Sequence, residues 1–480
     1  TKKIRMRFNY DYKSIALNFL NKILEKVSLN LVKTEKSELE IKKLKKLKDT
    51  QEFKTQVNSL INKYPENPNL NLIYSEFLFR NMDLEWMSQS KIYLKKRNQL
   101  IDKMNLKNFD LEFLGSENIC GSLGNHWEIK NIIDANFFGV RKEKKILIFL
   151  HKGSKLRNKT LIKYFSKYLE IVEENNLSSD LIKLEKFFKI PSGFLVPLND
   201  QVIFHEFLPS YINSFHSFSK RKNCFSMTEE DKKIGGELLE KLGIPKGKWF
   251  VTIHVREPGY RGENKNNTTE KFRNSSPQNY IKAINYIVSK GGWVVRVGDK
   301  SMTKLPKMKN FIDYAHSNFK SEFLDVFLAA NSRFCIGTPS GFYAMADYFG
   351  VPVLLTNAAM SSQFLSLKKE DLYLPRLIKH KNEFLNFESM FSHPNVWLYS
   401  DKLFSQQGLT TIENNENEIL EATEEMLNRV SYKEKENNNT NQLKAKDIIT
   451  KKINEISDVK LLPAASIASS YIEKNKGYLF

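Results

Sequence analysis

The chain has 480 residues, of which 41% are hydrophobic, so it is too long for one buried core and too apolar for a disordered protein. Its formal net charge is +20, yet lysine and asparagine are abundant along the whole chain, including helical surface segments, and no basic cluster is interleaved with aromatics. This pattern favours a general compositional bias first, an anionic partner such as a membrane surface or a sugar nucleotide second, and nucleic acid least.

No apolar run approaches the ~18 to 20 residues that a membrane-spanning helix requires, and no signal-peptide-like run opens the sequence. The cysteines Cys120, Cys224 and Cys335 are scattered, and two of them fall in apolar segments predicted as strands. We therefore expect free thiols in a reducing compartment, without disulfides or a zinc site. The predicted location is cytoplasmic, with the inner face of the membrane as a second option.

Residues 1–105 are predicted to be wholly helical. Apolar residues recur at helical spacing over Tyr12–Val27, Phe53–Ile61 and Leu70–Phe79. A docking or dimerisation layer, which would make a homo-oligomer, is the favoured interpretation, and a superhelix that binds a partner protein is the alternative. The basic run KKLKKLK at 42–48 is typical of a solvated helix face, or of a helix that contacts a membrane surface.

An α/β region is predicted over residues 106–245. The motif GSLGNHWE at 121–128 leads into a helix, and His126 at the start of that helix is a candidate functional residue or a packing residue. The predicted helices are Trp127–Phe138 and Leu161–Val172, and the predicted strands are Lys145–His151, Phe194–Val196 and Val202–Phe204.

A second α/β region is predicted over residues 246–425. The predicted strands are Trp249–Glu257, Trp293–Val297, Phe311–Tyr314, Arg333–Ile336 and Val351–Leu355. The helices between them are Pro277–Ser289, Ser321–Ala330 and one that GTPSG at 337–341 opens and Gly350 ends. This alternation predicts a parallel sheet whose ligand lies at the carboxyl ends of the strands.

The rest of the chain carries weaker patterns. A strand-poor stretch to Leu409 precedes a predicted helix at Asn417–Val430, and the Asn- and Lys-rich segment Tyr432–Gln442 resembles a linker. Residues 426–480 are predicted to be this linker and a final helix, Ala465–Glu473, that packs on the first α/β domain.

The polar residues at the strand ends suit a diphosphate. Gly337–Gly341 offers hydroxyls and backbone N–H groups at a helix N-terminus, which favours anions. Arg256 and Arg296 project from the ends of neighbouring predicted strands and could make bidentate phosphate contacts. In the alternative interpretation, GTPSG is only a turn and the arginines pair with Asp299 or Asp313.

Other phosphate-binding chemistries are not supported by motifs. The sequence contains neither a P-loop nor the dinucleotide pattern GxGxxG. Asp-x-Asp is also absent, and no His/Cys cluster has the spacing of metal ligands, so we expect neither a metal nor a cofactor.

Three segments resemble a known family: IHVRE at 253–257, the segment at 272–299, and the segment at 323–357. They are similar to bacterial glycosyltransferases of the GT-B fold, in which two Rossmann-type domains face a cleft and helical repeats often precede them. The His-x-Arg of 254–256 is also similar to the motif of fucosyltransferases.

This resemblance implies an enzyme that moves a sugar from a nucleotide sugar to a glycan or lipid-linked acceptor in surface polysaccharide synthesis, with inversion and without a metal. A glycosyltransferase that modifies protein side chains and a non-catalytic scaffold of polysaccharide synthesis remain alternatives. Nucleic acid is not an expected partner.

The sequence also predicts individual roles. Glu257 is the favoured general base, with His126, His254 and Glu263 as rivals, and Arg256 would stabilise the leaving diphosphate. We expect Gly341→Val to weaken nucleotide binding at little cost to folding. The predicted donor-binding residues are Arg256, Arg296, Gly298, Asp299, Asp313, Tyr314, Thr338, Ser340, Gly341 and Phe342, with Asp313 either accepting ribose hydroxyls or pairing with a lysine.

Overall fold

The computed structural model describes residues 40, 41, 43, 44, 46, 47, 50–104, 110–173, 182, 185, 188–190, 193–215, 225–259, 270–432 and 440–480. The predicted helix Tyr12–Val27, residues 42, 45 and 48 of the basic run, Cys224 and Glu263 lie outside these residues. The chain forms two compact units, one from residues 1–116, 143–154 and 169–202, and the other from 117–142, 155–168 and 203–480. The predicted domain boundaries stay a prediction.

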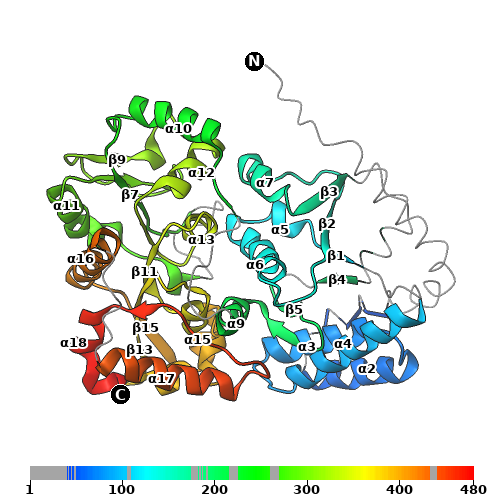
Figure 1. The fold of residues 1–480 in the computed structure, drawn as a ribbon. Coiled ribbons are helices and arrows are strands. Elements are labelled where there is room, and N and C mark those ends of the chain that lie inside the picture. The colour runs from blue at the N-terminus through cyan, green and yellow to red at the C-terminus, as the bar shows by residue number, and fades with distance from the viewer. Residues whose placement is uncertain are drawn as a thin grey trace. The chain divides into compact units, whose positions relative to one another are not determined.

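The first unit contains the three helices α2 (Thr50–Lys63), α3 (Pro68–Arg80) and α4 (Trp86–Lys103), in blue in Figure 1. The predicted helices at 53–61 and 70–79 are thereby confirmed. Helix α3 begins where the side chain of Asn67 accepts a hydrogen bond from the backbone N–H of Asn69, and Pro68 occupies the first turn.

A parallel sheet of order β3-β2-β1-β4 completes the first unit. Its strands are β1 (Leu111–Leu114), β2 (Lys145–Leu150), β3 (Leu169–Glu173) and β4 (Lys189–Ile190), and the short β5 (Leu195–Pro197) and β6 (Val202–Phe204) follow. The predicted helix Leu161–Val172 is wrong in its second half, because α7 (Lys159–Phe165) ends early and β3 begins. A short apolar run such as this one does not distinguish strand from helix by its periodicity.

Cys120 was predicted to lie in a strand, but it is the last residue of the short helix α5 (Glu117–Cys120). Helix α6 (His126–Phe137) confirms the predicted helix after GSLGNHWE. Helices α5, α6 and α7 belong to the second compact unit.

The second unit is built on a parallel sheet of order β16-β12-β11-β10-β7-β8-β9. Its strands are β7 (Phe250–His254), β8 (Trp293–Arg296), β9 (Phe311–Asp313), β10 (Cys335–Gly337), β11 (Val353–Ala358), β12 (Leu372–Pro375) and β16 (Ser466–Ile467). Numbered from β7, the central strands follow the Rossmann order 3-2-1-4-5-6, with the reversal between β7 and β10. The predicted α/β class with two Rossmann-type parallel sheets is confirmed.

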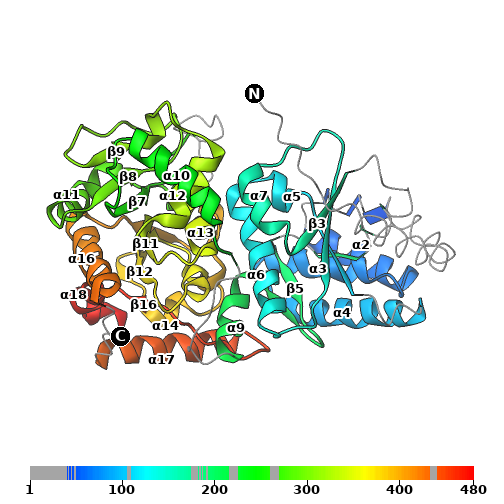
Figure 2. The same cartoon turned by 45° about the horizontal axis from the view of Figure 1, so that its top comes forward.

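Helices cover both faces of this sheet (Figure 2). One face carries α11 (Ile281–Ser289), α16 (Glu416–Tyr432) and α18 (Ser469–Leu479), and the other carries α10 (Glu229–Lys241), α12 (Glu322–Asn331) and α13 (Gly341–Tyr348). Helix α12 begins after Ser321, the first residue of the predicted helix, whose side chain caps it by accepting a hydrogen bond from the N–H of Leu324. The predicted helices of this region are therefore confirmed.

The sequence predicts few strands before Leu409, but the structure contains several in this stretch. Besides β12 it contains β13 (Leu377–His380) and β14 (Glu383–Phe384), and β15 (Leu409–Ile412) completes a small antiparallel sheet with them. Charged residues on the exposed positions of these short strands obscure the alternation of apolar side chains. Helices α9 (Leu208–Phe215), α14 (Phe387–Met390) and α15 (Asp401–Gln406) are further short elements of this unit.

The C-terminal residues differ from the prediction at the linker. Helix α17 (Thr440–Glu455) begins inside the predicted linker. The final helix α18 packs against α16 and α17, and β16 just before it pairs with β12 of the second sheet. The predicted packing of the final helix on the first α/β domain stays a prediction. Within the described residues, no helix combines the length and the apolar character needed to cross a membrane.

Candidate functional site

A cavity of about 550 Å³ lies inside the second unit, where β7, β8 and β10 end. This is the point at which the strand order reverses, the usual ligand position in such sheets. Eight predicted site residues line it: His254, Arg256, Glu257, Gly298, Asp299, Ser340, Gly341 and Phe342. The other five, His126, Arg296, Asp313, Tyr314 and Thr338, do not.

Thr338 joins the two strands at the reversal point. Its backbone N–H donates to the carbonyl of His254 over 3.1 Å, and its hydroxyl accepts from the N–H of Arg256 over 2.8 Å. The side chain is fully buried. Thr338 therefore holds the first residues of the GTPSG turn against the segment that carries Arg256.

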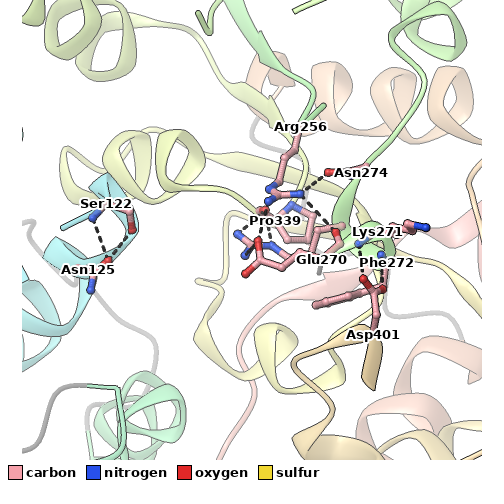
Figure 3. A network of polar contacts seen from close by, with 10 residues as sticks. Ser122, Asn125, Arg256, Glu270, Lys271, Phe272, Asn274, Pro339 and Asp401 are labelled. Atoms are coloured by element: carbon pink, nitrogen blue, oxygen red, sulfur yellow. Dashed lines mark hydrogen bonds and ion pairs between the residues drawn. The ribbon is translucent and has the colours of Figure 1, made fainter. Parts of the chain in front are cut away.

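Two arginines and one carboxylate form a cluster beside this turn (Figure 3). The guanidinium of Arg256 pairs with Glu270 at 2.6 Å and also donates to the side chain of Asn274. Arg273 pairs with the same carboxylate at 3.0 Å and donates twice to the carbonyl of Pro339, at 3.0 and 2.9 Å. The cluster keeps one net positive charge, and Arg273 fixes the backbone of the turn.

Arg273 and Glu270 were not among the predicted site residues, although Arg273 lies in a segment that carries the family resemblance. The carboxylate of Asp401 accepts the backbone N–H groups of Lys271 and Phe272, at 2.7 and 3.0 Å, and so fixes the short 3-10 turn that presents Arg273 (Figure 3). A sequence pattern gives no signal for such a long-range cap.

Arg296 has a different environment from Arg256. Its guanidinium is fully buried, and it pairs with Glu257 at 2.5 Å and with Asp313 at 3.1 Å. It also donates to the carbonyl of Thr303 at 2.6 Å. The structure thus supports the alternative interpretation for this arginine, in which it pairs with a carboxylate and does not face a phosphate.

Glu257 and Asp313 are occupied by the same network. One carboxylate oxygen of Glu257 binds Arg296, and the other accepts the backbone N–H of Thr303 at 3.0 Å. Asp313 also accepts the N–H of Leu305 at 3.3 Å. These contacts leave Glu257 less available as a general base and Asp313 less available to a ribose than the sequence led us to expect.

Tyr314 and His126 are buried and do not line the cavity. The Tyr314 hydroxyl accepts the backbone N–H of Ser321 at 3.1 Å, and burial raises its pKa. His126 packs against the ring of Phe165 at a centroid distance of 6.0 Å, and burial lowers its pKa to about 4. Such positions favour packing roles for both residues.

His254 lines the cavity as a neutral side chain. Burial, followed by the nearby charge of Arg296, lowers its pKa to about 4, so the imidazole carries no charge near pH 7. Its Nδ1 lies 3.0 Å from the hydroxyl of Ser340, and its ring stacks on Phe342 at 5.9 Å. His254 therefore orients Ser340 and adds no positive charge to the site.

Gly298 and Asp299 form the turn after β8. Gly298 has a φ of 152°, which favours glycine, and a Cβ there would lie 2.1 Å from the sulfur of Met302. The carboxylate of Asp299 accepts the N–H of Ser301 at 2.8 Å. This turn is a wall of the cavity whose shape depends on the absence of a side chain at 298.

Gly341 packs closely against another segment of the chain. A Cβ at this position would lie 2.6 Å from the backbone nitrogen of Gly124 and 2.8 Å from the Cβ of Leu123. The expectation that Gly341→Val costs little in folding is therefore wrong, because the 121–125 segment packs directly on this residue.

We predict that even Gly341→Ala lowers the free energy of unfolding, by roughly 1–3 kcal/mol, as overpacking does. Urea denaturation would measure the change. Gly236→Ala is the matched control, because helix α10 leaves open space around that position and alanine is the better helix former. Equal stability of the Gly341→Ala and parental proteins would contradict the prediction.

Further charged groups line the cavity that the sequence did not single out. They are Arg157, Glu206, Lys320, Glu322 and Asp325, in addition to Glu270 and Arg273. Lys320 pairs with Asp325 at 2.8 Å, yet burial raises the pKa of Asp325 above its usual range. Glu206 follows the predicted strand Val202–Phe204 by two residues, and that strand-end position was the only signal available for it.

Comparisons with known proteins give low similarities. No family model matches the chain, and no curated protein matches it. Among solved structures, the iron-containing dodecameric glycosyltransferase TibC of enterotoxigenic E. coli has 13% identity over 67% of this chain and 76% of its own, with a TM-score of 0.34.

Two further structures have similar scores. The ADP-heptose lipopolysaccharide heptosyltransferase II of E. coli has 9% identity over 66% of this chain and 98% of its own, with a TM-score of 0.39. A family 9 glycosyltransferase of Veillonella parvula has 10% identity over 51% and 79%, with a TM-score of 0.29. Similarities this low do not indicate a shared activity or substrate.

Proposed function

We propose that this chain is a glycosyltransferase that binds the diphosphate of a nucleotide sugar in the cavity of the second unit. The sugar would pass to a glycan or lipid-linked acceptor in bacterial surface polysaccharide synthesis, with inversion at the anomeric carbon. The proposal draws on the resemblance carried by residues 253–257, 272–299 and 323–357 for the sugar, and on the cavity for the diphosphate.

The observation that carries the proposal is the cluster of Arg256, Arg273 and Glu270 beside the GTPSG turn. Two guanidinium groups that share one carboxylate keep a net positive charge within a cavity at the strand-order reversal. Planar guanidinium groups suit phosphate oxygens, and the first turn of α13 adds the positive end of a helix dipole. A volume of about 550 Å³ is within the range of small-molecule sites.

The roles of the two arginines follow from their contacts. Arg273 is committed to the carbonyl of Pro339 and therefore shapes the turn. The guanidinium of Arg256 donates to the carbonyl and the carboxylate of Glu270, and 18% of its side chain is exposed, so an anion in the cavity can reach it. We propose that Arg256 contacts the β-phosphate and stabilises the charge that develops when the sugar leaves.

A divalent ion is the other common way to stabilise a leaving diphosphate. Among the described residues, no group of three or more His, Cys, Asp or Glu side chains is arranged to hold a metal ion. The net positive charge beside the turn suits the alternative, in which fixed cationic donors carry the charge. We therefore propose transfer that does not require an added metal.

The test is incubation of the full chain with UDP-, GDP- and ADP-sugars, with released nucleoside diphosphate as the readout. We expect one nucleotide class to bind by calorimetry and to be released, with unchanged rate after dialysis against EDTA. Loss of activity in EDTA that magnesium or manganese restores would contradict metal independence. Failure of every nucleotide sugar to bind would contradict the enzyme and leave the scaffold interpretation.

A further inference from the structure

Among the described residues, six carboxylates line the cavity, and five of them are held by an ion pair or by a backbone N–H group. Glu257 binds Arg296, Glu270 binds two arginines, and Asp325 binds Lys320. Asp299 accepts a backbone N–H of its own turn, and Glu322 accepts the N–H of Lys159 at 2.9 Å. These contacts assign the five carboxylates to holding the walls of the cavity.

Glu206 is the sixth carboxylate and differs from the others. Within the described part of the chain, its side chain has neither an ion pair with a cation nor a hydrogen bond from a backbone N–H, and the nearby hydroxyl of Ser362 favours its charged form. The residue remains partly accessible at the cavity wall. Desolvation raises its pKa above the usual value for glutamate, and only the Ser362 hydroxyl and the more distant charge of Arg273 oppose this shift.

The backbone around Glu206 is held firmly. The 3-10 turn His205–Phe207 packs against the 3-10 helix Ser361–Ser366, which supplies Ser362. On either side of Glu206, the rings of Phe204 and Phe207 contact the indole of Trp397 at centroid distances of 5.2 and 4.9 Å. A carboxylate supported in this way keeps its position without a salt bridge.

Glu206 also lies within electrostatic reach of the proposed diphosphate site. The charge of Arg273 acts on its carboxylate, and the same guanidinium binds the carbonyl of Pro339 in the GTPSG turn. The cavity thus combines a cationic side, formed by Arg256 and Arg273, with a carboxylate that neither an ion pair nor a backbone N–H holds within the described residues. Inverting transfer requires that combination, since a leaving anion and a departing proton need opposite partners.

We propose that Glu206 is the general base that accepts the proton of the acceptor hydroxyl. This inference rests on the proposed glycosyl transfer. The acceptor oxygen forms a bond to the anomeric carbon, and the bond from that carbon to the β-phosphate oxygen breaks, with its electron pair remaining on the diphosphate. The acceptor proton moves to the carboxylate of Glu206, so that charge and atoms balance. Glu257, the base favoured by the sequence, holds Arg296 instead.

The first test uses Glu206→Gln and Glu206→Ala with the nucleotide sugar that the parental chain cleaves, with water as the acceptor. We expect release of nucleoside diphosphate to fall by about 10²- to 10⁴-fold. The affinity for the same nucleotide sugar, measured by calorimetry, should be unchanged, because no ion pair within the described residues joins Glu206 to Arg256 or Arg273. Glu240→Gln, which removes an exposed carboxylate from the end of α10, should retain the parental rate.

Two readouts separate a base from a structural residue. Sodium formate should restore part of the rate of Glu206→Ala, since formate can occupy the vacated space, and should leave the parental rate unchanged. In the parental protein, turnover should rise with pH through the raised pKa of Glu206, because the base must be deprotonated. In Glu206→Gln this rise should disappear.

Each outcome has a definite meaning. A parental chain that binds and cleaves no nucleotide sugar would overturn the proposed function and, with it, the role of Glu206. A parental chain that cleaves one, together with a Glu206→Gln protein of equal rate, would overturn the role of Glu206 alone. Lost activity that formate does not restore, together with weakened donor binding, would also overturn it, since Glu206 would then support the site only structurally.

Discussion

Arg256→Lys should reduce turnover almost as severely as Arg256→Ala, by about 10²- to 10³-fold, the usual cost of removing one donor that stabilises developing charge. Departure of a nucleoside diphosphate adds roughly one negative charge to the β-phosphate, which a fixed cation must meet in the transition state. Lysine keeps the charge but loses the planar fork that can bind two oxygens at once.

The surroundings of Arg256 explain why lysine is a poor substitute. The guanidinium already donates to the carboxylate of Glu270 and the side chain of Asn274. A bound phosphate must accept hydrogen bonds from the same planar group. A lysine ammonium is a point charge on a flexible stem. It would pair with Glu270 and leave the phosphate without its donor.

The measurement is steady-state release of nucleoside diphosphate from the nucleotide sugar that the parental chain cleaves. Arg333→Lys is the matched control, because Arg333 lies over the ring of Trp249 and donates to Ser431, outside the cavity. Its rate should equal the parental rate. Parental turnover in Arg256→Ala would remove Arg256 from the mechanism.

Much of the second unit follows from local sequence patterns. Helix α12 begins at the predicted Ser321, and strands β7, β8 and β10 lie within or beside the predicted ranges. Those elements are bounded by caps, glycines and apolar runs, which act over a few residues. The reversal of strand order then brings their carboxyl ends together, so the position of the cavity could be predicted.

The direction of each polar side chain could not be predicted in the same way. Arg256 follows the buried strand β7 by two residues and Arg296 is the last residue of the neighbouring β8, but only Arg256 lines the cavity. In the sheet, Arg296 is the register partner of Asp313, and that pairing turns its charge into a buried contact. Strand register depends on the whole sheet and is not encoded near either residue.

Glu206 illustrates a second limit of sequence patterns. Its side chain belongs to a segment that precedes the sheet of the second unit by more than forty residues, and its partner Ser362 follows β11. No motif joins the two residues. Within the described residues Glu206 has neither an ion pair nor a backbone N–H donor, which distinguishes it from the other five carboxylates, and this difference is visible only once all six are placed around one cavity.

Arg296→Met should have the largest effect on stability, lowering the free energy of unfolding by about 3–5 kcal/mol, as expected when one partner of a buried ion pair is removed. The guanidinium is fully buried, and it is the shared partner of Glu257 and Asp313, whose side chains are 8% and 17% exposed. Without it, two poorly solvated carboxylates would repel each other and lose their donors. Methionine fills the volume, so the loss would report on charge and not on a cavity.

Urea denaturation at neutral pH would measure this effect. Arg80→Met is the control, because Arg80 is 67% exposed and pairs with Glu76 at 3.5 Å, a contact worth less than ~0.5 kcal/mol. The triple substitution Arg296→Met, Glu257→Gln and Asp313→Asn should recover much of the lost stability, since neutral amides do not require a counter-charge. If Arg296→Met unfolded at the parental midpoint, Arg296 would not be the structural centre of this network, and its predicted role at the phosphate would regain support.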